Sequence, residues 1–183
     1  IDFIRMAADD PKVLAIKQTI YRTGDDSQVA QALINAAERG KEVTVLVELK
    51  ARGDEAANIE WAKSMEESGI HVVYGIMGLK IHCKLSMLVR RDQDRLRRYA
   101  HLGTGNYNHT TARFYTDLGL ITAEPAITAE VAEVFNLLTA HNRETNFEQL
   151  LVAPAGLMRG MLDRIERESE QARAGRPAAI IAK

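Results

Sequence analysis

Three basic side chains alternate along one short stretch of the chain: Lys80, His82 and Lys84. The stretch, residues 79–89, follows a glycine-containing turn and is rich in residues that favour strands, so a strand is predicted. Residues two apart on a strand share a face, which would place the imidazole between two ammonium groups. Burying two unpartnered ammonium groups would cost several kcal/mol, so the pattern is a poor way to fill a core.

The chemistry that suits this arrangement is phosphoryl transfer. Neighbouring positive charge disfavours the imidazolium, which would keep His82 neutral and therefore nucleophilic. The two lysines would neutralise the phosphoryl oxygens as charge moves at phosphorus. The alternative is a surface strand with a solvated basic face, and both interpretations stay open on these residues alone.

The composition restricts the class of protein. The 183 residues are enough for one domain, or one large fragment, with a substantial core. A net charge of −1 predicts no general attraction to nucleic acid, so no nucleic-acid partner is expected and any anion site is local. The single cysteine, Cys83, excludes an internal disulfide. A cytosolic origin is expected, and the start at Ile1 rather than Met suggests a piece of a longer protein.

The hydrophobic pattern predicts alternating strands and helices. Strands are expected at residues 13–21, 43–49, 70–74, 79–90, 95–102, 115–122 and 178–182, and helices at 1–10, 25–39, 54–68, 128–138 and 154–174. Strand-helix alternation followed by a hairpin predicts an α/β fold with a mixed β-sheet flanked by helices. The charged final segment, residues 154–183, is expected to connect to a second domain that is absent here.

Two arginines follow two of the predicted strands directly, Arg22 after the first and Arg52 after the second. Ligands of open α/β sheets lie beyond the carboxyl ends of the strands, and guanidinium groups suit phosphate oxygens. The glycine-rich segment at residues 103–108 could add main-chain N–H donors and the Asn106 amide. Neither a P-loop nor a complete dinucleotide fingerprint is present in the sequence.

Two of these motifs together resemble the phospholipase D superfamily. His82-Cys83-Lys84 matches its HxK motif, and residues 103–106 match its GSxN-type loop. In such enzymes the histidine forms a phosphoenzyme intermediate. In the superfamily, HxK is followed by four residues and then Asp, whereas this chain has Val89 at that position, so a carboxylate that orients the imidazole has to come from elsewhere.

Longer sequence segments resemble the polyphosphate kinase family of the bacterial long-chain type. They lie at residues 16–22, 43–52, 78–85, 99–108 and 111–117, and the resemblance covers nearly the whole chain. It implies that residues 1–183 are a single phospholipase D-like catalytic half-domain, the first of two related C-terminal domains. It also implies reversible transfer of the terminal phosphate of ATP to inorganic polyphosphate, with His82 as the phosphohistidine.

The resemblance also implies roles for other residues. Tyr115 matches a residue that contacts ATP, and Arg22 and Arg52 match positions that the family associates with magnesium. A guanidinium has no acceptor for a metal, so we expect these arginines to meet Mg²⁺ through a phosphate oxygen. We add Lys84 and Asn106 as phosphate contacts.

The implied partners are ATP and ADP, polyphosphate and the remaining domains of the same polypeptide. The family further implies a homo-oligomer that associates with the membrane, and the isolated fragment is expected to be inactive. Two alternatives stay open. One is a phosphodiesterase of the phospholipase D type, against which Val89 argues, and the other is a non-catalytic polyphosphate-binding module.

Overall fold

The computed structural model describes residues 1–21, 24, 26–48, 55–75, 78–140 and 146–182. The chain forms two compact units, Ile1–Thr145 and Asn146–Lys183. The first unit holds all of the strands found in the described ranges. It also holds every candidate residue, and Arg22 and Arg52 among these lie outside the described residues.

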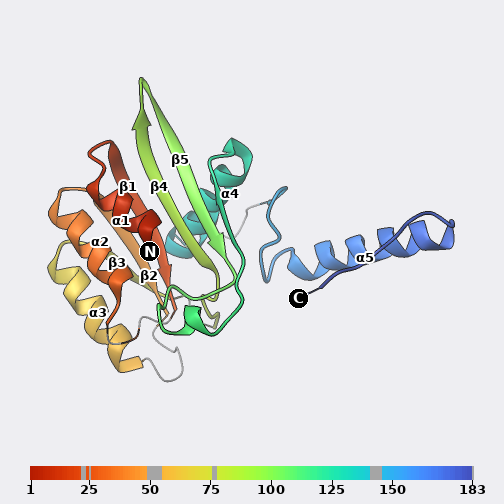
Figure 1. Cartoon of the computed structure of the whole chain (residues 1–183), viewed down its shortest axis with the longest axis horizontal. Helices are drawn as coiled ribbons and strands as arrows, with labels where there is room; N and C mark the ends of the chain where they lie inside the picture. The colour runs from red at the N-terminus through yellow and green to blue at the C-terminus, as the bar shows by residue number, and fades with distance from the viewer. Residues whose placement is uncertain (22–23, 25, 49–54, 76–77, 141–145, 183) are drawn as a thin grey trace. The chain divides into compact units, whose positions relative to one another are not determined.

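A six-stranded mixed sheet forms the centre of the first unit, in the order β3-β2-β1-β4-β5-β6 (Figure 1). The strands are β1 (Val13–Ile20), β2 (Glu42–Val47), β3 (His71–Tyr74), β4 (Lys84–Asp92), β5 (Arg95–Gly103) and β6 (Gly119–Thr122). The first three pair in parallel, and β4 then runs antiparallel to β1 and starts an antiparallel half. The α/β fold with a mixed sheet, predicted from the alternation of elements, is confirmed.

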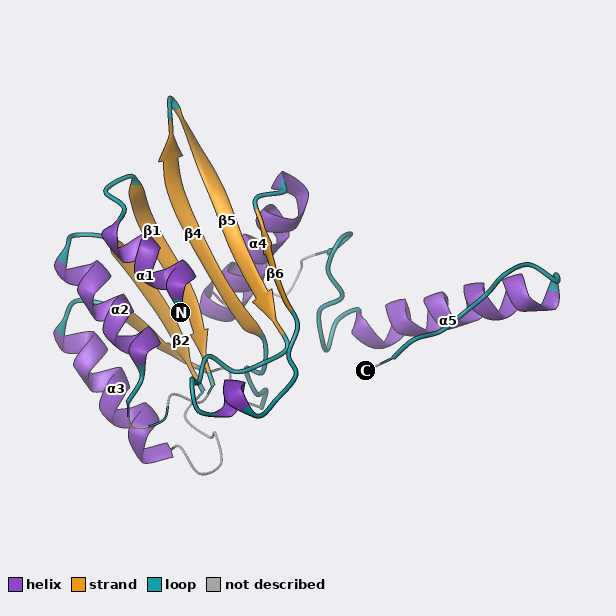
Figure 2. Ribbon diagram, in the orientation of Figure 1, coloured by secondary structure: helices purple, strands orange, loops and turns teal. Residues whose placement is uncertain are grey.

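Helices cover both faces of this sheet (Figure 2). One face carries α1 (Asp2–Asp9), α2 (Gln28–Glu38) and α3 (Glu55–Glu67), and the other carries α4 (Pro125–Ala140). A short 3-10 helix, η1 (Thr111–Arg113), follows β5. The start of α2 is fixed by Ser27, whose side chain accepts the Ala30 N–H and satisfies a donor that the helix leaves open.

The two layers of helix create two apolar cores. Beneath α1 to α3 the fully buried side chains include Ile16, Leu33, Val45 and Met65, and on the α4 side they include Val131 and Phe135. Burying a side chain of this size contributes roughly 1.5–3 kcal/mol. Because both faces of the sheet are covered in this way, the ends of the strands are the places where a ligand can reach it.

Three predicted strands differ from the structure. The strand expected from residue 79 begins at Lys84, after Gly78, which has a positive φ of 83°. The strand expected at residues 115–122 is confined to Gly119–Thr122. Residues 178–182, all of them described, form no strand. The alternation of Lys80, His82 and Lys84 on one strand face is therefore wrong, because only the last of them belongs to a strand.

The second unit contains α5 (Leu157–Arg173), a single long helix with Gly156 at its N-cap. It begins three residues after Pro154, where the sequence predicted its start. A role for residues 154–183 as a connector to another domain stays a prediction. In the described ranges no helix combines the length and apolar character that crossing a membrane requires.

Candidate functional site

His82, Lys84 and Asn106 lie at one end of the sheet, where β1, β2 and β5 end and β4 begins. The register of β4 and β5 pairs Lys84 with Gly103, so the segment that carries His82 lies beside the glycine-rich loop. These two segments are far apart in sequence and are brought together by the β4–β5 hairpin, as Figure 2 shows. The antiparallel pairing that sequence patterning predicts is therefore what assembles this part of the site.

His82 is exposed, whereas the residue before it, Ile81, is buried. The imidazole packs edge-on against the ring of Tyr21, with the ring centroids 4.8 Å apart and an interplanar angle of 83°. Tyr21 is the residue that directly follows β1. The side chain of His82 is thus presented to solvent from an anchored stretch of main chain, as a nucleophile that meets an incoming substrate requires.

Lys84 differs from the sequence interpretation because it is buried, with 6% of its surface exposed. Its Nζ donates a hydrogen bond to the main-chain oxygen of His82 and lies 5.1 Å from the centroid of the Tyr21 ring. Burial lowers the pKa of Lys84, and the negative charge of Asp117 acts in the opposite direction. The alternative of a solvated basic face that includes Lys84 is therefore wrong. The ammonium group of Lys84 is instead held at the main-chain oxygen of His82.

The glycine-rich loop is held by Asp117. Thr104 Oγ1 donates to Asp117 Oδ1 at 2.9 Å and accepts the Leu118 N–H at 3.0 Å. A Cβ atom on Gly105 would come within 2.2 Å of Asp117 Oδ2. Only glycine allows this close approach without displacing the carboxylate.

Asn106 follows in the same loop, and its side-chain Oδ1 is buried without a hydrogen-bond partner among the described residues. A buried acceptor in this condition costs roughly 1–3 kcal/mol, and in a native fold it calls for an explanation such as a bound group. The Oδ1 of Asn106 is therefore suited to accepting a hydrogen bond from a bound group, and its Nδ2 is the atom that could donate to a phosphate oxygen.

A row of polar residues, in which Gln18 and Ser86 are buried and His101 is half-buried, crosses the sheet next to this loop. Gln18, Ser86 and His101 are direct neighbours in the register of β1, β4 and β5. Gln18 Oε1 and Ser86 Oγ have no partner within the described part of the chain, whereas His101 Nδ1 lies 2.7 Å from Tyr107 Oη. Burial lowers the pKa of His101. Sequence reasoning missed Gln18 and Ser86, although each interrupts an apolar strand.

A pocket of about 380 Å³ lies on one side of the loop and is lined in part by His101, Asn106 and Asp117. His82 and Lys84 are not among its lining residues. The hollow is therefore next to the loop but separate from the imidazole, and we do not assign the phosphoryl group to it.

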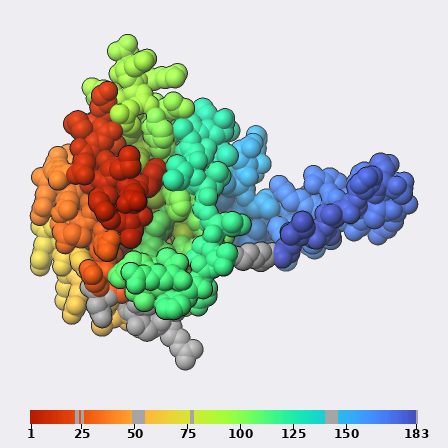
Figure 3. All heavy atoms as spheres, viewed as in Figure 1, coloured from red at the N-terminus to blue at the C-terminus, as the bar shows by residue number. Residues whose placement is uncertain are grey.

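The other predicted contacts are placed only in part. Tyr115 follows η1 and is 69% exposed. The green segment that contains η1 lies at the lower surface of the first unit in Figure 3. Arg22 and Arg52 lie outside the described residues, so their convergence on one rim stays a prediction. Within the described ranges no group of three or more His, Cys, Asp or Glu side chains could hold a metal ion.

Two further buried residues at this end escaped the sequence interpretation. Asn58 in α3 is fully buried, and its Nδ2 donates to the main-chain oxygens of Tyr21 and Glu48, each at 3.0 Å. Glu48, which directly follows β2, accepts the Ile81 N–H on Oε2 at 3.0 Å. A signal existed in both cases, since each is a polar residue next to an apolar run, but nothing local predicts its partner.

Comparison with known proteins gives a consistent result. Residues 1–144 match the family model described as polyphosphate kinase C-terminal domain 1. A polyphosphate kinase of Streptomyces coelicolor is 56% identical over 178 residues, which are 97% of this chain and 24% of that protein. The chain therefore spans about a quarter of the length of such relatives.

Solved structures show the same fold. Polyphosphate kinase from Porphyromonas gingivalis matches with a TM-score of 0.81 and 39% identity, over 94% of this chain and 29% of that one. Nuc, a phospholipase D family member from Salmonella typhimurium, matches with a TM-score of 0.60 and 16% identity, over 79% of this chain and 90% of that one. The second likeness concerns the fold alone.

Proposed function

Because the chain belongs to the polyphosphate kinase family, we propose that it is a catalytic part of an ATP:polyphosphate phosphotransferase in which His82 carries the phosphoryl group. The observation that carries this proposal is the setting of His82, which is exposed while its main-chain oxygen is bonded to the buried ammonium group of Lys84. A cation held in place by the fold needs little reorganisation when charge develops at phosphorus.

The proposed reaction has two reversible steps. A ring nitrogen of His82 attacks the terminal phosphorus of ATP, a P–N bond forms, and the P–O bond to ADP breaks with its electron pair leaving on ADP. A terminal oxygen of polyphosphate then attacks the same phosphorus, and the P–N bond breaks to restore the imidazole. Polyphosphate lengthens by one phosphate in this direction, and ATP is made in the reverse direction.

Other residues would contact the substrates during these steps. Lys84 and Asn106 are proposed to stabilise the phosphoryl group, the first by charge and the second by its amide. Tyr115, an exposed aromatic residue, is proposed to contact ATP. Arg22 and Arg52 are proposed to bind phosphate oxygens. Mg²⁺ is proposed to come with the nucleotide phosphates as part of the substrate, and the two arginines are proposed to meet it through a phosphate oxygen.

The proposal extends to the longer protein. The remaining domains of the same polypeptide are proposed to complete the active site, so that the 183-residue chain alone is inactive. The complete enzyme is proposed to be a cytoplasmic homo-oligomer that associates with the membrane.

The proposal is tested by labelling the full-length parent enzyme with [γ-³²P]ATP in the presence of Mg²⁺. The wild type is expected to gain acid-labile label, and His82→Ala is expected to lose it, with a fall in polyphosphate synthesis of at least about 10³-fold. Cys83→Ala, a change at the adjacent half-buried residue, is the matched control and should keep the label. Wild-type labelling of His82→Ala would refute the role of this histidine.

Labelling and polyphosphate synthesis by the full-length enzyme also separate the two alternatives, because each of them predicts neither. A phosphodiesterase of the phospholipase D type would hydrolyse a nucleotide or lipid diester without ATP. A non-catalytic module would bind polyphosphate and show no turnover in the full-length protein. The fold likeness to Nuc is compatible with the first alternative, and Val89 at the acidic position of the motif argues against it.

A further inference from the structure

His82 lies outside the strand ladder, in the segment between Gly78 and the start of β4. Regular strand pairing therefore does not hold its main chain. Instead, three consecutive residues are each bonded by a side chain: the Ile81 N–H donates to Glu48 Oε2 at 3.0 Å, Lys84 Nζ donates to the oxygen of His82, and Thr19 Oγ1 donates to the oxygen of Cys83 at 2.8 Å.

Thr19 contributes two of the bonds that fix this segment. It lies in β1 with 1% of its surface exposed. Its hydroxyl donates to the oxygen of Cys83 and also accepts the Leu85 N–H at 3.0 Å. One side chain thus spans the two residues that surround Lys84 and sets where β4 begins.

Glu48 holds the other side of the histidine. It follows β2 directly, is 5% exposed, and donates its own N–H to the oxygen of Ile20 at 2.9 Å. The main-chain oxygen of Glu48 is fixed in turn by Asn58. A buried carboxylate that accepts a main-chain N–H makes one of the stronger kinds of hydrogen bond, and its own main chain is tied to two elements.

We propose that Thr19 and Glu48 are positioning residues that hold the main chain on either side of His82 and thereby aim its imidazole. This inference rests on the proposed role of His82 as the phosphorylated residue. A nucleophile has to be held within about 0.5 Å of the productive geometry for full activity, and a displacement of about 1 Å can cost about 10²-fold in rate. Neither residue needs to touch the substrate.

Matched pairs of substitutions in the full-length parent enzyme test this role. Thr19→Val removes the hydroxyl with little change of shape, and Thr19→Ser keeps the hydroxyl. Glu48→Met removes the acceptor, and Glu48→Gln keeps an oxygen in place. The readouts are the single-turnover rate of phosphohistidine formation, the KM for ATP, and the rate of hydrogen exchange in a peptide that covers Ile81.

We expect Thr19→Val and Glu48→Met to slow phosphohistidine formation by about 10–100-fold, with a change in KM of less than about twofold. Thr19→Ser and Glu48→Gln should remain within about threefold of the wild type. Glu48→Met should also speed hydrogen exchange at the Ile81 amide. A residue that only supports the fold would change activity in proportion to the unfolded fraction, which a thermal melt measures.

The positioning role is overturned if either disruptive variant stays folded, loses its protection at this segment and still forms phosphohistidine at the wild-type rate. The proposed function would survive that result. If Thr19→Val does not fold, Thr19→Ala and the Glu48 pair carry the same test. Absence of phosphohistidine in the wild-type enzyme would refute the proposed function, and the positioning role with it.

Discussion

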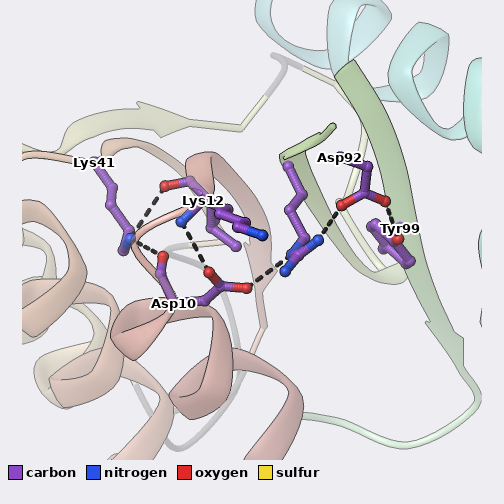
Figure 4. A network of polar contacts seen from close by, with 7 residues as sticks. Asp10, Lys12, Lys41, Asp92 and Tyr99 are labelled. Atoms are coloured by element: carbon purple, nitrogen blue, oxygen red, sulfur yellow. Dashed lines mark hydrogen bonds and ion pairs between the residues drawn. The ribbon is translucent and has the colours of Figure 1, made fainter. Parts of the chain in front are cut away.

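The two ends of the sheet use charged side chains in different ways. At the end away from His82, Arg90 Nε bonds Asp10 Oδ2 at 2.8 Å, Arg90 also pairs with Asp92, and the hydroxyl of Tyr99 donates to Asp92 at 2.5 Å (Figure 4). One guanidinium is therefore paired with two carboxylates. This cluster, the Arg90 network, joins the end of α1 to the β4–β5 hairpin.

At the end where His82 lies, side chains bond to the main chain instead. Lys84 donates to the oxygen of His82, and Glu48 accepts the N–H of Ile81. No salt bridge to Lys84 occurs within the described ranges. The positive field of Lys84 is therefore not cancelled by a paired carboxylate, and it remains available to an anionic ligand.

Under the proposed function, the paired charges at one end serve stability and the charge of Lys84 at the other end serves the reaction. Charges that pair with each other lock elements together, whereas a charge bonded to a neutral carbonyl can still act on a substrate. The interpretation is tested by changing one residue at each end of the sheet and measuring whether the activity or the stability of the protein changes.

The largest effect is expected for Lys84→Met in the full-length enzyme. The methionine keeps most of the length of the side chain and removes the charge, so kcat should fall about 10²-fold or more. The melting temperature should hold or rise, because a buried ammonium group no longer has to be desolvated. The measurement is steady-state polyphosphate synthesis combined with a thermal melt.

Lys80→Met is the matched control, because Lys80 precedes the same histidine but is exposed. Its effect on kcat should stay below about fivefold. Equal losses in the two variants, or full activity of Lys84→Met, would show that the buried cation has no special part in the reaction.

A smaller effect, on stability, is expected for Asn58→Ala. The change removes the two hydrogen bonds that Nδ2 donates to the main-chain oxygens of Tyr21 and Glu48, which should lower the free energy of unfolding by about 2 kcal/mol. Urea unfolding measures this loss. Asn35→Ala, at a half-buried asparagine of α2, is the comparison and should cost less than about 1 kcal/mol. Equal costs at both positions would contradict the tie between the ends of β1 and β2.

The smallest effect is expected at the Arg90 network, and it should depend on pH. The hydrogen bond from Arg90 lowers the pKa of Asp10 from its usual 3.8. Hydrogen bonds from Tyr99 first, and then from Arg90, lower the pKa of Asp92. A folded-state pKa below the unfolded value stabilises the protein above pH 3.8, and this contribution is lost as the pH falls through the folded-state pKa.

Arg90→Met should therefore lower the melting temperature near neutral pH, and the gap to the wild type should narrow as the pH approaches about 2. The kcat of the full-length enzyme should stay within about twofold of the wild type, since the network lies at the far end of the sheet. Melts over a series of pH values test the first statement and activity assays test the second. A pH-independent gap, or a large loss of kcat, would contradict the structural role of this network.

The sequence by itself determined the mixed α/β sheet, because the buried strands are apolar runs and Ser27 supplies a helix start that local chemistry explains. It also predicted a hairpin of the strands at residues 79–90 and 95–102, and the register of β4 and β5 shows that this hairpin brings the glycine-rich loop beside the histidine segment. Its sequence motifs also indicated the polyphosphate kinase family, which the comparisons confirm.

Only the tertiary structure decided that His82 lies before the strand and that Lys84 is buried. The reason is that side chains distant in sequence hold this segment: the bond from Thr19 to Cys83 spans 64 positions and the bond from Ile81 to Glu48 spans 33. No short-range sequence pattern predicts hydrogen bonds between such distant residues, because a threonine or a glutamate beside an apolar strand has many possible partners. The packing of β1 against β4 and β2 selects one of them.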